Sequence, residues 1–135
     1  MSSLNIYKDE NCEKTKDCDL YFDKDSYIVA IESNILGFFS LTEYDKKTVL
    51  VNYELLKKYR NMGIGNDFYK IIEKYIIDNY DYERIVLVIS YDNCKSINIA
   101  INHNYTLDNE FDELNEVRNH KVYAKSIERK QQSVL

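Results

Sequence analysis

The chain of 135 residues has no proline, no tryptophan, only three glycines and only three cysteines. Cys12, Cys18 and Cys94 are odd in number and lack the paired spacing of a zinc site, so we expect no metal and favour a reducing cytoplasm. No apolar run approaches the roughly 20 residues that span a membrane, and residues 1–16 lack the apolar core of a secretory signal. These absences predict a cytoplasmic protein without a membrane partner.

Excess positive charge is also lacking. A formal net charge of −5 argues against nucleic acid or an anionic membrane surface as the partner. Hydrophobic residues make up 44% and charged residues 30%, which is typical of a globular chain. The length suits one core rather than two, and we expect a single domain over residues 1–135. Thirteen tyrosines accompany abundant Lys, Asn and Ile. This bias makes each tyrosine a weak catalytic candidate on its own.

Apolar patterning predicts alternating strands and helices. The first predicted helix is amphipathic, runs from about Ile64 to Asn79 and connects two strands, which predicts a right-handed parallel βαβ unit. A second helix follows Asp92 or Asn93, either of which can cap it, and ends near His103. Gly37 lies inside a strand and indicates a bulge or a close backbone contact. An apolar anchor is expected at 20–22, a frayed tail at 127–135, and strands at 4–7, 27–31, 35–41, 48–56, 84–90, 105–107 and 122–124.

Two of the three glycines lie in the turn that joins a predicted strand to the first helix. The turn reads Arg60-Asn61-Met62-Gly63-Ile64-Gly65. Glycine permits unusual backbone angles and close approach of a ligand. The start of a helix adds unpaired N–H groups at the positive end of its dipole, which suits a phosphate. The spacing matches neither a P-loop nor a dinucleotide-binding fingerprint.

This Arg-x-x-Gly-x-Gly turn resembles the acyl-CoA pyrophosphate loop of the GCN5-related N-acetyltransferase (GNAT) superfamily. Residues 93–105 are similar to the family segment Asn-x-x-Ala/Ser-x-x-x-Tyr-x-x-x-Gly-Phe: Asn93 and Ser96 match, Asn104 replaces Gly and Tyr105 replaces Phe. The resemblance covers residues 27–126. It implies an α/β (α+β) fold with a mixed, mostly antiparallel central sheet of about six to seven strands, helices on both faces, and a shortened N-terminal part over residues 1–26.

The resemblance also implies a function: transfer of an acetyl group from acetyl-CoA to a primary amine of a small molecule or a protein. Backbone N–H groups of the turn would hold the pyrophosphate, and the Arg side chain would brace the loop or neutralise charge. Backbone groups at the end of the preceding strand would pair with the pantetheine arm. The implied cofactor-binding residues are Leu55, Lys57, Arg60, Asn61, Met62, Gly63, Ile64, Gly65, Asn66, Asn93 and Ser96.

The catalytic residues depart from the family pattern, because the usual acid of the family, a Tyr, is replaced by Ala100. Tyr105, Tyr91 or a water could substitute. The common base of the family is a Glu on the strand before the loop. Alternation puts Tyr53 on the face with Val49, Val51 and Leu55, which we expect to meet the acceptor, and turns Glu54 away. Tyr53 and Tyr105 are therefore the catalytic candidates, with Glu32 or a water chain as another base.

Three hypotheses follow. The first is a small N-acyltransferase, for which the acidic chain favours a cationic amine acceptor. The second is a catalytically weak or inactive GNAT-like module that binds acyl-CoA or another protein, suggested by Ala100 and by the short N-terminal part. The third is an unrelated α/β domain with a chance glycine turn. Because few residues precede Tyr27, the acceptor site is expected to be reduced, more open, or completed by a second subunit of a homodimer.

Overall fold

The computed structural model describes residues 4–9, 26–108 and 119–129. The predicted anchor at 20–22 and residues 130–135 of the predicted tail lie outside these ranges. The described helical elements are a 3-10 turn η1 (Lys57–Tyr59) and the α-helices α2 (Gly65–Asn79) and α3 (Cys94–Asn102). The described strands are β1 (Leu4–Lys8), β2 (Ser26–Ile31), β3 (Asn34–Asp45), β4 (Thr48–Leu55), β5 (Arg84–Ser90), β6 (Thr106–Leu107) and β7 (His120–Ser126).

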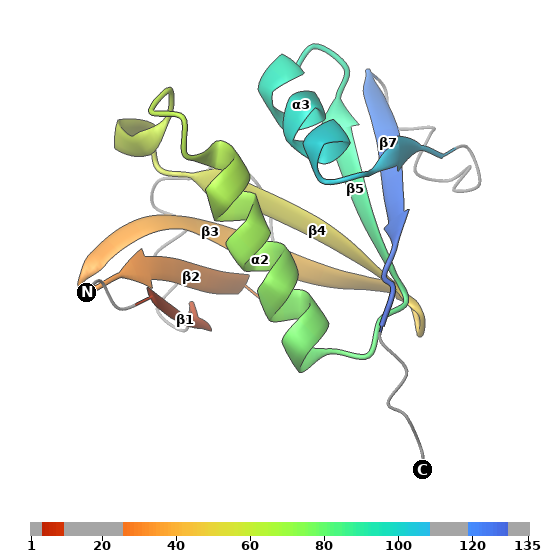
Figure 1. Ribbon diagram of the computed structural model, residues 1–135, viewed down its shortest axis with the longest axis horizontal. Helices are drawn as coiled ribbons and strands as arrows, with labels where there is room; N and C mark the ends of the chain where they lie inside the picture. Colours follow the sequence, from red (N-terminus) through yellow and green to blue (C-terminus); the bar gives the residue numbers. More distant parts are fainter. Residues whose placement is uncertain (1–3, 10–25, 109–118, 130–135) are drawn as a thin grey trace.

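The seven described strands form one twisted sheet in the order β1-β2-β3-β4-β5-β7-β6 (Figure 1). Strands β1 to β4 are paired antiparallel, β4 and β5 are parallel, and β7 is antiparallel to both β5 and β6. Helix α2 connects the two parallel strands, as predicted for the βαβ unit. The predicted mixed, mostly antiparallel sheet is confirmed.

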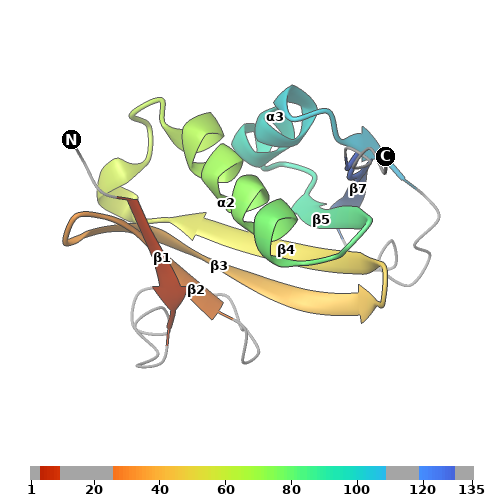
Figure 2. The ribbon, with the colours of Figure 1, turned by 60° about the horizontal axis from the view of Figure 1, so that its bottom comes forward.

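Both described helices lie on the same side of the sheet (Figure 2). Alternation along β4 directs Val49 and Val51 to this side, where they join Phe68, Ile72 and Ile76 of α2 in the main apolar cluster. Both helices of the described residues, α2 and α3, pack on this one core, and the prediction of helices on both faces stays a prediction. The opposite face carries two smaller buried clusters, around Val86, Val122 and Ala124 and around Ile28, Ala30 and Phe38.

Several local predictions are confirmed. The side chain of Asn93 accepts a hydrogen bond from the Ser96 backbone N–H at 3.2 Å, so Asn93 is the cap of α3. Asn104 has φ 69°, the left-handed conformation expected after a helix. A Cβ atom at Gly37 would lie 2.3 Å from the Glu54 carbonyl oxygen, which confirms the close backbone contact there. In the described part of the chain, no helix has both the length and the apolar character needed to cross a bilayer.

Candidate functional site

The sheet opens between its two central strands. The ladder between β4 and β5 joins Thr48 to Arg84 and Leu50 to Val86, and extends no further. Beyond this point β4 stays paired with β3 as far as Leu55, whereas β5 stays paired with β7. The far ends of two neighbouring parallel strands are thus held by different partners. Beyond the pair Leu50–Val86, the facing backbone N–H and C=O groups of β4 and β5 are not hydrogen-bonded to each other and can bind a ligand.

The glycine turn lies beside this opening and exposes a row of donors. Asn61 and Gly63 have φ values of 64° and 75°, and α2 begins at Gly65 without a side-chain cap. The first intrahelical bond runs from Phe68 N–H to the Ile64 carbonyl at 2.9 Å. Within the described ranges, the N–H groups of residues 61–67 donate to no backbone carbonyl. Unpaired N–H groups at the positive end of a helix dipole are suited to an anion.

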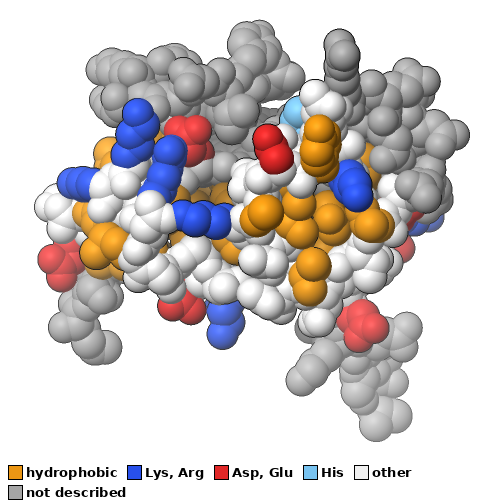
Figure 3. Space-filling view, turned by 90° about the horizontal axis from the view of Figure 1, so that it is seen from above, with side chains coloured by type: hydrophobic (Ala, Val, Ile, Leu, Met, Phe, Trp, Pro, Cys, Tyr) orange, Lys and Arg blue, Asp and Glu red, His pale blue; other side chains and the backbone are white. Residues whose placement is uncertain are grey.

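Opening and turn together form a cleft of about 830 Å³. Seen from above, Lys and Arg side chains gather toward one side of this end of the molecule (Figure 3). The cleft is lined by both sides of the opening and by the first turn of each helix, namely Tyr53, Glu54, Leu55, Tyr59, Arg60, Asn61, Gly63, Ile64, Gly65, Asn66, Phe68, Asn93, Lys95, Ser96, Asn98 and Ile99. The structure therefore brings together most of the predicted site residues from segments far apart in the sequence.

Arg60 fastens the turn to the end of β4. Its Nε donates a hydrogen bond to the Leu55 carbonyl oxygen at 2.8 Å, and its guanidinium lies 3.7 Å from the Glu54 carboxylate. The same side chain lines the cleft. The geometry matches the bracing role suggested by the sequence, and it adds a positive charge to the wall beside the free N–H groups.

Three predicted site residues do not line the cleft. Lys57 starts the 3-10 turn η1, so its backbone leaves the direction of β4 before it could extend the strand. The Met62 side chain is 63% exposed, on the outside of the turn. Tyr105 is 3% exposed and lies in the core, where its hydroxyl is 2.6 Å from the Tyr69 hydroxyl and donates to Glu73 at 2.9 Å. Burial and these neighbours raise the Tyr105 pKa far above its ordinary value, so it is not placed to protonate anything in the cleft.

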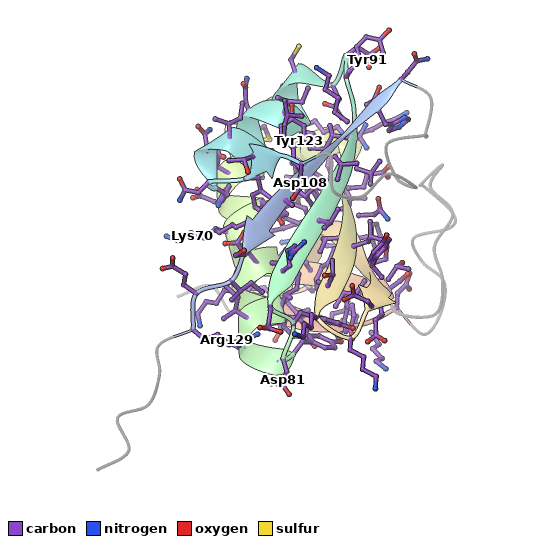
Figure 4. All side chains as sticks on the ribbon, turned by 90° about the vertical axis from the view of Figure 1, so that its right-hand side faces the viewer. Lys70, Asp81, Tyr91, Asp108, Tyr123 and Arg129 are labelled. Atoms are coloured by element: carbon purple, nitrogen blue, oxygen red, sulfur yellow. The ribbon has the colours of Figure 1, made fainter. Side chains whose placement is uncertain are left out.

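Tyr53 and Glu54 both line the cleft, against the expectation that only Tyr53 would. The face that carries Tyr53 is the one covered by α2, so this side chain packs on Phe68 and Tyr69 at ring-centroid distances of 6.4 and 5.1 Å. Burial raises the Tyr53 pKa above its ordinary value, and the neighbouring Ser96 hydroxyl opposes that rise. Tyr91, the other tyrosine considered, is 55% exposed just past β5 (Figure 4) and is not part of the cleft.

Sequence reasoning missed six lining residues: Glu54, Tyr59, Phe68, Lys95, Asn98 and Ile99. Phe68 was expected on the inner face of α2, but without a part in the site. Ile99 lies three residues after the predicted Ser96, so a helical projection would have found it, whereas Lys95 and Asn98 do not share that spacing with Asn93 or Ser96. Glu54 lies at a strand end and Tyr59 in a 3-10 turn, where the periodicity of the sequence does not predict which way a side chain points.

The geometry described above agrees with the comparisons with known proteins. The model of the family described as "Acetyltransferase (GNAT) family" matches residues 3–100. This chain belongs to the GNAT family. No curated protein matches it.

Solved structures support the fold. The chain is similar to Ard1 from Thermoplasma volcanium, with a TM-score of 0.68, 10% identity, and coverage of 93% of this chain and 99% of that one. A GNAT-family acetyltransferase from Bacillus anthracis has a TM-score of 0.62 and 16% identity over 76% of this chain and 66% of its own. Campylobacter jejuni N-acetyltransferase PseH, solved in complex with acetyl coenzyme A, has a TM-score of 0.63 and 13% identity over 75% and 66%. The chain thus spans about two thirds of the length of the latter two.

Proposed function

We propose that this GNAT protein transfers an acetyl group from acetyl-CoA to the primary amine of a small molecule or a protein. The observation that carries the proposal is the continuity of the cleft. A row of unpaired N–H groups at the start of α2 runs directly into the opening between β4 and β5. A diphosphate matches the row of N–H groups, and an extended amide-containing arm matches the opening between β4 and β5.

Each wall of the cleft has a distinct part in holding this substrate. The N–H groups of residues 61–66 would bind the diphosphate, and Arg60 would add a positive charge while keeping the turn attached to β4. The end of β4 at Leu55 and the first turn of α3 at Asn93 and Ser96 would border the pantetheine arm. Lys57 and Met62 are not part of this proposal, because neither lines the cleft.

The chemistry requires attack of a neutral amine on the thioester carbon and departure of CoA. Holding the two reactants together supplies much of the acceleration in reactions of this kind. A net charge of −5 supports a cationic acceptor such as a polyamine, a lysine side chain, an aminoglycoside or a protein N-terminus.

Calorimetric titration with acetyl-CoA tests the first half of the proposal. We expect a dissociation constant in the micromolar range for the wild-type chain. Arg60→Ala should weaken binding by about tenfold, because it removes a charge-assisted contact and the brace on the turn. Lys74→Ala is the matched control, since Lys74 pairs with Asp78 on the exposed face of α2 and should bind as wild type does. Absence of binding at millimolar acetyl-CoA would overturn the proposal.

A second candidate is an acyl-CoA-binding or interaction module with weak or no turnover. Ala100 favours it: this residue is fully buried on α3 and cannot donate a proton. Thiol release measured over a panel of amines separates the two. Release above the hydrolysis background with any amine supports the transferase, whereas tight binding of acetyl-CoA without release over the whole panel supports the binding module.

A further inference from the structure

One hydroxyl group in the wall of the cleft has no hydrogen-bond partner. The Tyr53 hydroxyl is buried, and the Ser96 hydroxyl is its polar neighbour, but neither Ser96 nor any other donor or acceptor in the described part of the chain meets it with hydrogen-bond geometry. Ser40 Oγ is the other such buried side-chain atom there, and it does not line the cleft. Buried polar groups in native proteins are nearly always hydrogen-bonded. An unpaired hydroxyl beside a binding cleft is therefore expected to form its hydrogen bond with the bound ligand.

Tyr53 lies where the two central strands part. It follows the last ladder pair of β4, at Leu50, and precedes Leu55 at the strand end. Its ring points to the side of the sheet that carries the helices, and Ser96 of α3 lies opposite, in the same cleft. The diphosphate turn at 61–66 forms the outer part of the cleft. An arm bound at that turn and extended into the opening would bring its far end, the thioester, to the Tyr53 side chain.

The Tyr53 ring is held rigidly from behind. It packs on the Tyr69 ring, and the Tyr69 hydroxyl is 2.6 Å from that of Tyr105. Tyr105 donates to Glu73, and Glu73 also accepts a hydrogen bond from Lys125 at 2.6 Å. This buried chain of contacts fixes the surface against which Tyr53 lies. A phenol fixed in this way is pre-organised, which is the condition for a useful proton donor.

The family acid would sit on α3, at the position of Ala100. Ala100 belongs to the apolar cluster against which the Tyr53 ring packs. The phenol that α3 lacks is therefore replaced by the phenol of Tyr53 on β4. Burial raises the Tyr53 pKa, and the hydroxyl therefore keeps its proton at neutral pH and can donate a hydrogen bond to sulfur as negative charge develops there.

We infer that Tyr53 is the proton donor to the sulfur of the departing CoA, an assignment that rests on the proposed function. The amine nitrogen bonds to the thioester carbon, the carbon–sulfur bond breaks, and its electron pair remains on sulfur. Sulfur then takes the proton from the Tyr53 oxygen. The phenolate recovers a proton from water, and the proton lost by the amine passes to water, so atoms and charges balance.

CoA itself is a sufficient probe, because the assignment concerns its thiol and needs no acceptor. The pKa of the bound thiol can be read from thiolate absorbance during a pH titration. A donor at sulfur stabilises the thiolate, so Tyr53→Phe should raise the pKa of bound CoA by about one unit. Tyr91→Phe is the matched control: Tyr91 is exposed and outside the cleft, and the thiol pKa should stay at the wild-type value.

A second measurement uses the wild-type chain alone. CoA should bind about fivefold more tightly than desulfo-CoA, which lacks the thiol, and Tyr53→Phe should lose that preference. Failure of CoA to bind the wild-type chain overturns both the proposed function and this assignment. CoA binding with the same thiol pKa in wild type and Tyr53→Phe, or with no preference over desulfo-CoA, overturns the assignment of Tyr53 and leaves the proposed function standing.

Discussion

Gly63→Ala is the substitution that separates the conformation of the glycine turn from its contacts. Gly63 has φ +75°, and a Cβ atom built there would have no neighbour within 4 Å. Alanine at this position therefore meets no steric obstacle and disturbs only the backbone preference. A side chain in the left-handed region costs about 1–2 kcal/mol. Part of this cost is offset because alanine also restricts the unfolded chain, which leaves a net loss of about 1 kcal/mol.

This cost of about 1 kcal/mol must lower either the free energy of unfolding or the affinity for acetyl-CoA. If the turn keeps its shape, the free energy of unfolding falls by about 1 kcal/mol and the affinity for acetyl-CoA is unchanged. If the turn relaxes, stability is retained, but only a fraction of molecules presents the N–H row. The apparent dissociation constant then rises by up to about fivefold. Chemical denaturation and calorimetry on the same samples measure both quantities, and their changes should sum to about 1 kcal/mol.

Asn119→Ala is a suitable control for this substitution. Asn119 also has a left-handed backbone, with φ 64°, but it lies at the start of β7 and does not line the cleft. It should lose stability in the same way and bind acetyl-CoA as wild type does. Wild-type stability together with wild-type affinity in Gly63→Ala would refute the reasoning, because the turn would then not need the conformation described here.

Three further predictions follow from the core. Glu73→Gln should lower the free energy of unfolding by about 3 kcal/mol, since it leaves the partly buried Lys125 ammonium unpaired, and acetyl-CoA affinity should not change. Gly37→Ala should cost about 2–3 kcal/mol in the same denaturation assay and also weaken acetyl-CoA binding, because its Cβ would displace the end of β4 at the Glu54 carbonyl. The free energy of unfolding should begin to fall near pH 10. The folded chain keeps phenolic protons that the unfolded chain releases at the ordinary pKa of 10.0. The free energy of unfolding is therefore unaffected below that pH and falls by about 1.4 kcal/mol per pH unit per tyrosine above it. The tyrosines concerned are Tyr53, Tyr69 and Tyr105, and replacing Tyr69 with Phe should reduce the slope measured by denaturant titration at a series of pH values.

Local signals in the chain predicted much of the fold. Alternating apolar residues define the strands because successive side chains of a strand point to opposite faces. The cap at Asn93 and the left-handed residue at Asn104 depend on interactions within a few residues, so the sequence carries them directly. The glycine pair at 63 and 65 predicted the turn for the same reason.

The candidate site was predictable only in part. Residues of the turn were found because a short motif contains them, whereas Lys57 was misplaced because a 3-10 turn ends the strand earlier than the apolar pattern does. Tyr105 occupies a core position, as an aromatic replacing Phe does, and its hydroxyl found a buried acceptor on α2. No local sequence pattern predicts that acceptor, because Glu73 is distant from Tyr105 in the chain.

The sequence by itself determined the order of the elements, the apolar faces and the glycine turn, because each follows from the chemistry of neighbouring residues. Tertiary structure alone decided where β4 and β5 part, that both described helices share one face, and that the hydroxyl of the partly buried Tyr53 is itself buried and unpaired beside the cleft. Those features depend on which strand each edge pairs with and on contacts such as Lys125 with Glu73, which are 52 residues apart. Such contacts form only once the sheet has brought distant segments together.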